Sequence, residues 1–210
     1  GTGFRSPYYV TDVVNERVDF DKALIYATNK KISKVSDRFD DLLQYINENQ
    51  IPLLIICKDI DMHISTMLID NVMKGQLKVC VCKAPGFGEQ QNDELRDIGV
   101  VLGKAPFMEN EGVDFDDLED LNAVIERLPI SEQVIVTKNS LAIKAPVGLE
   151  DEEYQKIQSD KEARLEVLRE KVTDEHTTYE QAILQARISR LSEGLAYINI
   201  GAYTDVEYTE

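Results

Sequence analysis

A chain of 210 residues is long enough to bury a sizeable core, as one large domain or two small ones. It carries 39 acidic and 23 basic residues, a net charge of −16, and has no basic block. Because nucleic acids and anionic membranes are bound through clustered cations, this balance argues against both as partners. No apolar run approaches the roughly 20 residues of a membrane-spanning helix. The first residues also lack the apolar core of a signal peptide.

The first part of the chain predicts one strand and one helix. The segment Gly1–Val10 is turn-like and rich in aromatic residues, which are more often core than exposed. A strand is predicted at Ala23–Ala27 and a helix at Ser33–Asn49, which Ser36 or Asp37 can cap. Apolar residues recur along this helix at Val35, Phe39, Leu42, Leu43 and Ile46.

The stretch Ile51–Gly88 predicts a βαβ unit. Leu53–Cys57 is an unbroken apolar run, typical of a strand buried on both faces. A helix at Asp61–Lys74 follows, with Gly75 where a helix ends, and then a second strand at Leu77–Cys82. Strand, helix and strand in this order predict two parallel strands joined by a right-handed crossover.

The helix of this unit has two apolar stripes. At 100° per residue the first stripe, which can cover the sheet, contains Ile60, Ile64, Met67, Leu68 and Val72. The second stripe contains Met62, Ile69 and Met73. A surface helix needs only one apolar face, so the second is either buried by another element or exposed for a partner. From the sequence, these alternatives are about even.

The cysteines indicate a reducing compartment and no metal. Cys57, Cys80 and Cys82 all lie in predicted buried strands, and the last two share one strand face. Reduced core thiols in a cytosolic-type compartment are the favoured interpretation. A zinc site is the weaker alternative, since no nearby Cys or His pair completes it.

The loop Lys83–Gly88 is rich in glycine and follows a buried strand. Such a loop could cradle a phosphate, which would make the chain an α/β enzyme domain. It lacks the complete phosphate-binding motifs, and Glu89–Gln91 bring no positive charge, so a structural turn is favoured. His63 and His176 have no nucleophile at a suggestive spacing, and the acidic run Asp114–Asp120 lacks the spacing of a calcium loop.

The middle of the chain predicts further alternating elements. Helices are expected at Gln90–Leu102 and Phe115–Leu128, and a short strand at Lys104–Met108. Strands at Gln133–Thr137 and Leu141–Ala145 flank an Asn-Ser pair and predict a β-hairpin.

The composition changes at Glu150. Two charged helices, Glu150–His176 and Thr178–Ser192, predict an antiparallel pair, and Leu195–Ile200 a final strand. Thr204–Glu207 is a capping box, which predicts a helix that the chain is too short to complete. We therefore expect the chain to be a piece of a longer protein.

At this point the sequence resembles the apical domain of group I chaperonins of the GroEL type. The most specific motif is K-A-P-G-F-G at Lys83–Gly88, shortly after M-K-G at residues 73–75. The stretches that carry the resemblance are Ser6–Thr11, Asn29–Ser33, Ile51–Asp61, Asn71–Glu89 and Arg190–Glu207. It runs from about Gly3 to Glu210, essentially the whole chain.

The resemblance implies a fold and a division into domains. It implies an α/β fold with sheet layers flanked by helices, plus an antiparallel helical pair. Residues 1–200 would be the apical domain, with the helical pair at 150–193. Residues 201–210 would be the truncated start of the intermediate-domain helix.

The resemblance also implies a function and a site. The apical domain binds non-native polypeptide in an apolar groove between two helices, here Ser36–Asn49 and Met62–Lys74, and the mobile loop of a co-chaperonin competes for it. The residues implied by position are Phe4, Ser6, Tyr8, Tyr9, Phe39, Leu42, Leu43, Ser65, Ile69, Asp70, Asn71 and Lys74. This revises the core assignment of Tyr8 and Tyr9. At Ser65 and Asp70 the family is usually apolar, so a more polar groove is expected.

The remaining implications concern the longer parent protein. The parent would be a cytoplasmic ring homo-oligomer that hydrolyses ATP with Mg, whereas this piece carries no ATP-site motif. The piece itself is expected to be a monomer without cofactor, metal or enzymatic activity. Thr2 and Glu89–Gln91 replace basic residues of the family, so subunit contacts are expected to differ.

Overall fold

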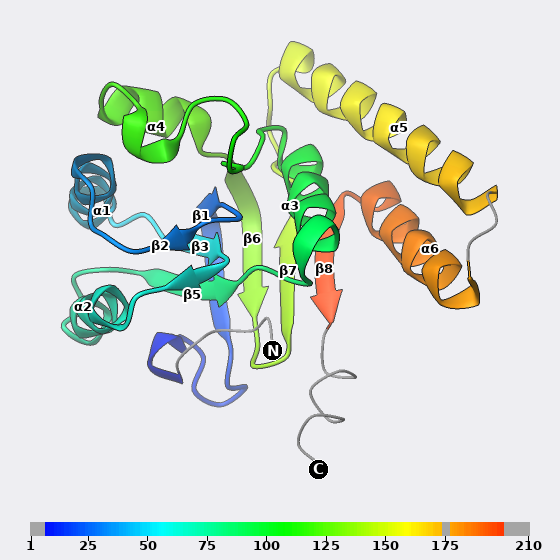
Figure 1. Ribbon diagram of the computed structural model, residues 1–210. Helices are drawn as coiled ribbons and strands as arrows, with labels where there is room; N and C mark the ends of the chain where they lie inside the picture. Colours follow the sequence, from blue (N-terminus) through cyan, green and yellow to red (C-terminus); the bar gives the residue numbers. More distant parts are fainter. Residues whose placement is uncertain (1–6, 174–176, 200–210) are drawn as a thin grey trace.

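A six-stranded mixed sheet forms the centre of the computed structural model, which describes residues 7–173 and 177–199 (Figure 1). The strand order is β5-β3-β1-β6-β7-β8. These strands are β1 (Val18–Ala27), β3 (Leu53–Cys57), β5 (Val79–Lys83), β6 (Ile130–Val136), β7 (Ser140–Lys144) and β8 (Leu195–Asn199). Two short strands, β2 (Lys31–Ile32) and β4 (Asp59–Ile60), pair separately. With helices on both sides, the expected α/β fold class is confirmed.

The parallel half of the sheet contains the predicted βαβ unit. β3 pairs in parallel with β1 and with β5, in a register that places Leu54 beside Cys80. Helix α2 (Met62–Met73) joins β3 to β5. All five residues of β3 are fully buried, as an unbroken apolar run in a covered sheet requires. Gly75 has a φ of 72°, which a glycine adopts without strain just after the helix.

Helices cover both faces of this half. Tyr26 of β1 packs against Phe39 of α1 (Asp37–Asn49), whereas its neighbours Ile25 and Ala27 line a small cavity with Ile98 of α3 (Gly88–Leu102). Successive strand residues point to opposite faces. Helices α1 and α3 therefore lie on opposite sides of the sheet.

The antiparallel half carries a helical pair. The predicted hairpin is confirmed as β6 and β7, and β8 pairs antiparallel with β7. Between β7 and β8 the chain forms α5 (Asp151–Thr173) and α6 (Thr178–Ser192), which pack along each other beside α3 (Figure 1). A capping box of Thr177 and Glu180 begins α6.

Two predicted elements are wrong. The stretch Phe115–Leu128 is not one helix but a 3-10 turn, η2 (Phe115–Asp117), followed by α4 (Leu121–Arg127). The side chains of Asp114 and Asp120 each accept a backbone hydrogen bond and start a new helix, which breaks the run. Lys104–Met108 is not a strand and forms only a single bridge, between Phe107 and Thr28.

The structure also bears on the cysteines, on membrane-spanning helices and on the C-terminal boundary of the domain. Cys57, Cys80 and Cys82 are buried and form no disulfide with one another, with 3.9 Å between the Sγ atoms of the last two. No helix within residues 7–173 and 177–199 combines the length and apolar character needed to cross a membrane. Residues 201–210, including the predicted capping box, and His176 lie outside the described residues, so the boundary at residue 200 stays a prediction.

Candidate functional site

Helix α2 packs against the body of the domain with one face. Ile64 and Leu68 of the first stripe are fully buried, and Met67 and Val72 are half-buried beside them. Asp61 precedes the helix in an extended conformation, and the backbone N–H of Lys74 donates to Asp70 at its end. The spacing of Ile64 and Leu68, one helical turn apart, is what places both on the buried face.

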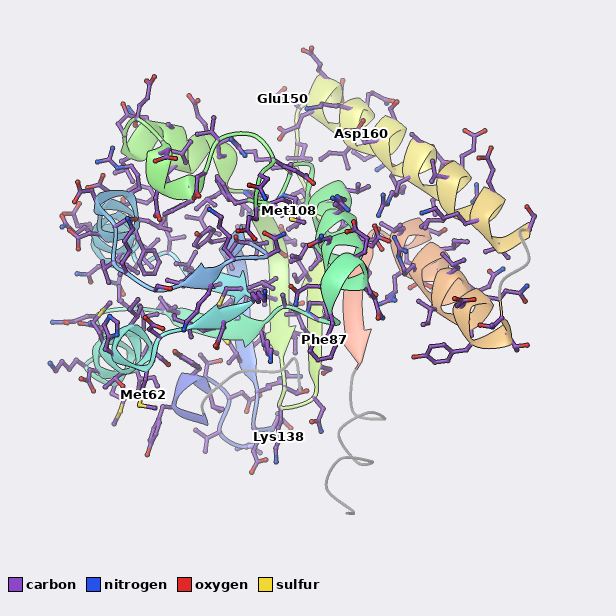
Figure 2. All side chains as sticks on the ribbon, viewed as in Figure 1. Met62, Phe87, Met108, Lys138, Glu150 and Asp160 are labelled. Carbon is purple, nitrogen blue, oxygen red and sulfur yellow. The ribbon has the colours of Figure 1, made fainter. Side chains whose placement is uncertain are left out.

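The second stripe of α2 is largely exposed. Met62 and Met73 expose 83% and 64% of their surface, and Ile69 is half-buried against the core. Figure 2 labels Met62 at the end of α2. Of the two alternatives left open by the sequence, burial of the stripe by another element therefore holds only in part for Ile69, and the described residues leave Met62 and Met73 exposed.

A short 3-10 turn, η1 (Pro7–Tyr9), packs against α2 and β5. Tyr8 is exposed (59%), whereas Tyr9 is buried (1%). The turn thus places one aromatic ring on the surface beside α2 and anchors itself with the next. Phe4 and Ser6, also predicted for the site, lie outside the described residues.

The three residues of α1 that were predicted to line the groove are not exposed. Phe39, Leu42 and Leu43 are all buried, and the ring of Phe39 contacts those of Tyr26 and Phe115. The reason is that β1 and η2 supply an aromatic cluster that encloses this face of α1. These three residues lie in the core beneath α1 and do not line an open groove.

The outer face of α2 is partly polar. Asp70 and Lys74 are exposed, and Ser65 and Asn71 are half-buried. The side-chain amide of Asn71 donates to the carbonyl of Met67 at 2.8 Å, so it is occupied within its own helix. The surface therefore combines two exposed methionines with a carboxylate and an ammonium group.

Three hollows among the described residues lie elsewhere in the fold. Two of about 10 Å³ flank α3. A third, of about 510 Å³, lies where β7, α5 and α6 meet, lined by residues such as Tyr154 and Lys161. None of the three is lined by α1 or α2. The candidate site is thus an exposed apolar surface formed by Tyr8, Met62, Ile69 and Met73, which we name the α2–η1 surface.

The loop Lys83–Gly88 has a structural explanation. The buried side-chain amide of Gln91 donates to the carbonyl oxygens of Ala84 and Gly86, and this holds the loop closed from inside. Positive φ angles at Gly86 and Gly88 allow the tight path. No group of three potential metal-ligating side chains occurs in the described ranges either. The hydrogen bonds of Gln91 favour the structural turn over the phosphate site.

Comparison with known proteins bears on these observations. No family model matches the chain. The chain is 36% identical over 209 residues to the mitochondrial heat shock protein 60 of Candida albicans, a match that covers 99% of this chain. The resemblance to group I chaperonins is confirmed. The match takes in 34% of the relative, so the chain spans about a third of that chaperonin's length, in agreement with an apical-domain piece.

The same chaperonin corrects one prediction. The cytoplasmic location inferred from the sequence is wrong by this comparison, because the matched chaperonin is a mitochondrial protein. Reduced cysteines indicated a reducing compartment, but they do not distinguish one such compartment from another.

Two groups of exposed apolar side chains, one in the site and one in the turn after η1, were not among the residues predicted from the chaperonin pattern. Met62 and Met73 were visible in the second stripe of the helix but were not carried into the predicted set. Val13 and Val14, in the turn after η1, expose 80% and 92% of their surface. The sequence signal for the exposure of Val13 and Val14 was their position in a segment otherwise rich in turn residues.

Proposed function

We propose that this chain is the polypeptide-binding domain of a chaperonin, which captures non-native chains on the α2–η1 surface and so assists their folding. Its parent would be a ring of identical subunits, with ATP and Mg bound in segments outside this chain. The mobile loop of a co-chaperonin would compete for the same surface. The chain alone is expected not to hydrolyse ATP.

The observation that carries the proposal is the double-sided character of α2. Its sheet-facing residues, Ile64 and Leu68, are fully buried, whereas Met62 and Met73 expose most of their surface. A misfolded chain exposes apolar segments, and burying these yields about 25 cal/mol per Å² of apolar surface. Methionine is flexible and polarisable, which suits contact with many different sequences.

The polar residues of α2 support a moderate affinity. Asp70 and Lys74 flank the methionines on the exposed face, and each must lose water when a client covers it. Binding would then depend on a few apolar anchors and not on a continuous apolar groove. An extended segment or an amphipathic helix laid along α2 fits this pattern.

The experiment compares two matched double variants in the binding of a fluorescent client kept unfolded by reduction and alkylation. Met62→Ser with Met73→Ser is expected to weaken binding about tenfold, through loss of roughly 1.4 kcal/mol of burial. Because both residues are exposed, the unfolding midpoint should not change.

The control is Val147→Ser with Tyr154→Ser, which removes two exposed apolar side chains near the start of α5. It should bind the client as the parent chain does. An unaltered affinity in the methionine variant, or an equal loss in the control, contradicts the proposal.

A further inference from the structure

We infer that Val13 and Val14 extend the α2–η1 surface, so that it takes extended apolar segments long enough to reach from α2 to the turn at residues 12–17. The inference rests on the proposed function and specifies its substrate: a continuous extended segment and not an isolated apolar side chain. The turn would then set the preferred length of the captured segment.

The first observation is the exposure of the two valines. Val13 and Val14 expose 80% and 92% of their surface. Valine is usually buried, and turns normally carry Gly, Asn, Asp, Ser or Pro. Single exposed apolar residues are common on protein surfaces, but two adjacent ones beside further exposed apolar side chains are less so.

The second observation is that the turn is firmly built. The backbone of Asp12 and Arg17 exchanges hydrogen bonds of 2.9 and 3.1 Å, and the guanidinium of Arg17 lies 3.3 Å from the Asp12 carboxylate. The same carboxylate accepts from the backbone N–H and the side-chain amide of Asn15. The valines between these anchors are therefore held outward by the turn.

The third observation is continuity with the α2–η1 surface. Tyr8 is five residues before Val13, so the two lie within about 18 Å even along a fully extended chain. η1 packs directly on α2, and the turn lies beside η1 at the same end of the molecule (Figure 1). A segment that already lies on α2 therefore needs about six further extended residues, at roughly 3.3 Å each, to reach the turn.

A captured chain segment fits the turn better than a second copy of the domain. A stable protein–protein interface buries about 800 Å² on each partner. Two valines on a narrow turn offer far less than that, and the other exposed apolar groups lie on separate elements. An extended segment can contact such scattered anchors in sequence, with water between them.

The test uses two synthetic peptides rich in leucine and phenylalanine, one of about six residues and one of about fourteen, so that only the longer can reach the turn. Val13→Ser with Val14→Ser is expected to weaken the longer peptide about fivefold and leave the shorter unchanged. Met62→Ser with Met73→Ser should weaken both. Val147→Ser serves as the exposed-valine control and should change neither.

The outcomes separate the two proposals. If the methionine variant weakens both peptides but the valine variant weakens neither, the turn is not part of the surface and the proposed function stands. If neither variant weakens either peptide, the proposed function fails as well. A change in oligomeric state of the valine variant, by light scattering, would mean that the turn contacts a second copy, and this also overturns the inference.

Discussion

At the scale of single residues, burial changes the pKa of ionisable side chains, and Glu94 of α3 is the clearest case. It lies where α3 meets α6, with one carboxylate oxygen 3.7 Å from Arg190. Burial raises the pKa of Glu94, and the nearby Arg190 guanidinium offsets this only in part. Asp93 and Asp97 on its own helix and Arg187 on α6 also act on it.

The raised pKa predicts a direction for stability. The folded state holds the Glu94 proton more tightly than the unfolded state, whose pKa is near 4.5. The contribution of Glu94 to the unfolding free energy therefore rises as pH falls from neutral through its folded pKa, and becomes constant below about 4.5. Glu94→Gln should be more stable than the parent chain at pH 7, and the difference should shrink toward pH 4.

Urea unfolding between pH 4 and pH 8 measures this difference. Glu162→Gln, at an exposed position on α5, should show none of it. A Glu94→Gln variant that is less stable than the parent at pH 7, or that keeps the full pH dependence, would contradict the assignment.

At the scale of elements, charge as well as apolar contact docks the helical pair. Asp97 of α3 accepts from Arg187 of α6 at 2.7 and 3.1 Å and from Arg164 of α5 at 3.0 Å. Its side chain is only 9% exposed and that of Arg187 only 6%. One carboxylate thus joins three helices.

Removal of the Asp97 carboxylate should weaken the packing of α5 and α6 against α3. Asp97→Ala leaves two guanidinium groups without their main partner, so it is expected to lower the unfolding free energy by about 3–5 kcal/mol. Hydrogen exchange should quicken in α5 and α6 and stay unchanged in α1 and α2. The exposed pair of Glu162 and Arg169 gives the control, since Glu162→Ala should cost less than about 1 kcal/mol. Equally faster exchange in all four helices would refute a local role for Asp97.

At the scale of the whole molecule, the sequence predicted the regular elements well where the pattern was local. The unbroken run of β3, the two-striped helix α2 and the β6–β7 hairpin all follow from residues close in the chain. The first half of β1 was missed because Asp19, Asp21 and Lys22 interrupt its apolar pattern. The break between η2 and α4 depends on aspartate caps that periodicity does not reveal.

The candidate site was less predictable for a physical reason. The apolar stripe of α1 did indicate that Phe39, Leu42 and Leu43 face the core, whereas the chaperonin pattern placed them in the groove. The rings that cover Phe39 belong to Tyr26 of β1 and Phe115 of η2, and no pattern within α1 could show this. The exposure of Met62 and Met73 could be suspected from the second stripe of α2. The structure shows that exposure directly, with most of the surface of both methionines open to solvent.

The most direct test of polypeptide capture by the α2–η1 surface is site-specific photo-crosslinking. The native cysteines are fully buried, so an added exposed cysteine can be labelled selectively with a benzophenone maleimide. Met62→Cys should then crosslink an unfolded client in much higher yield than Tyr154→Cys at the start of α5. Equal yields from the two positions, or a higher yield from position 154, would contradict the account.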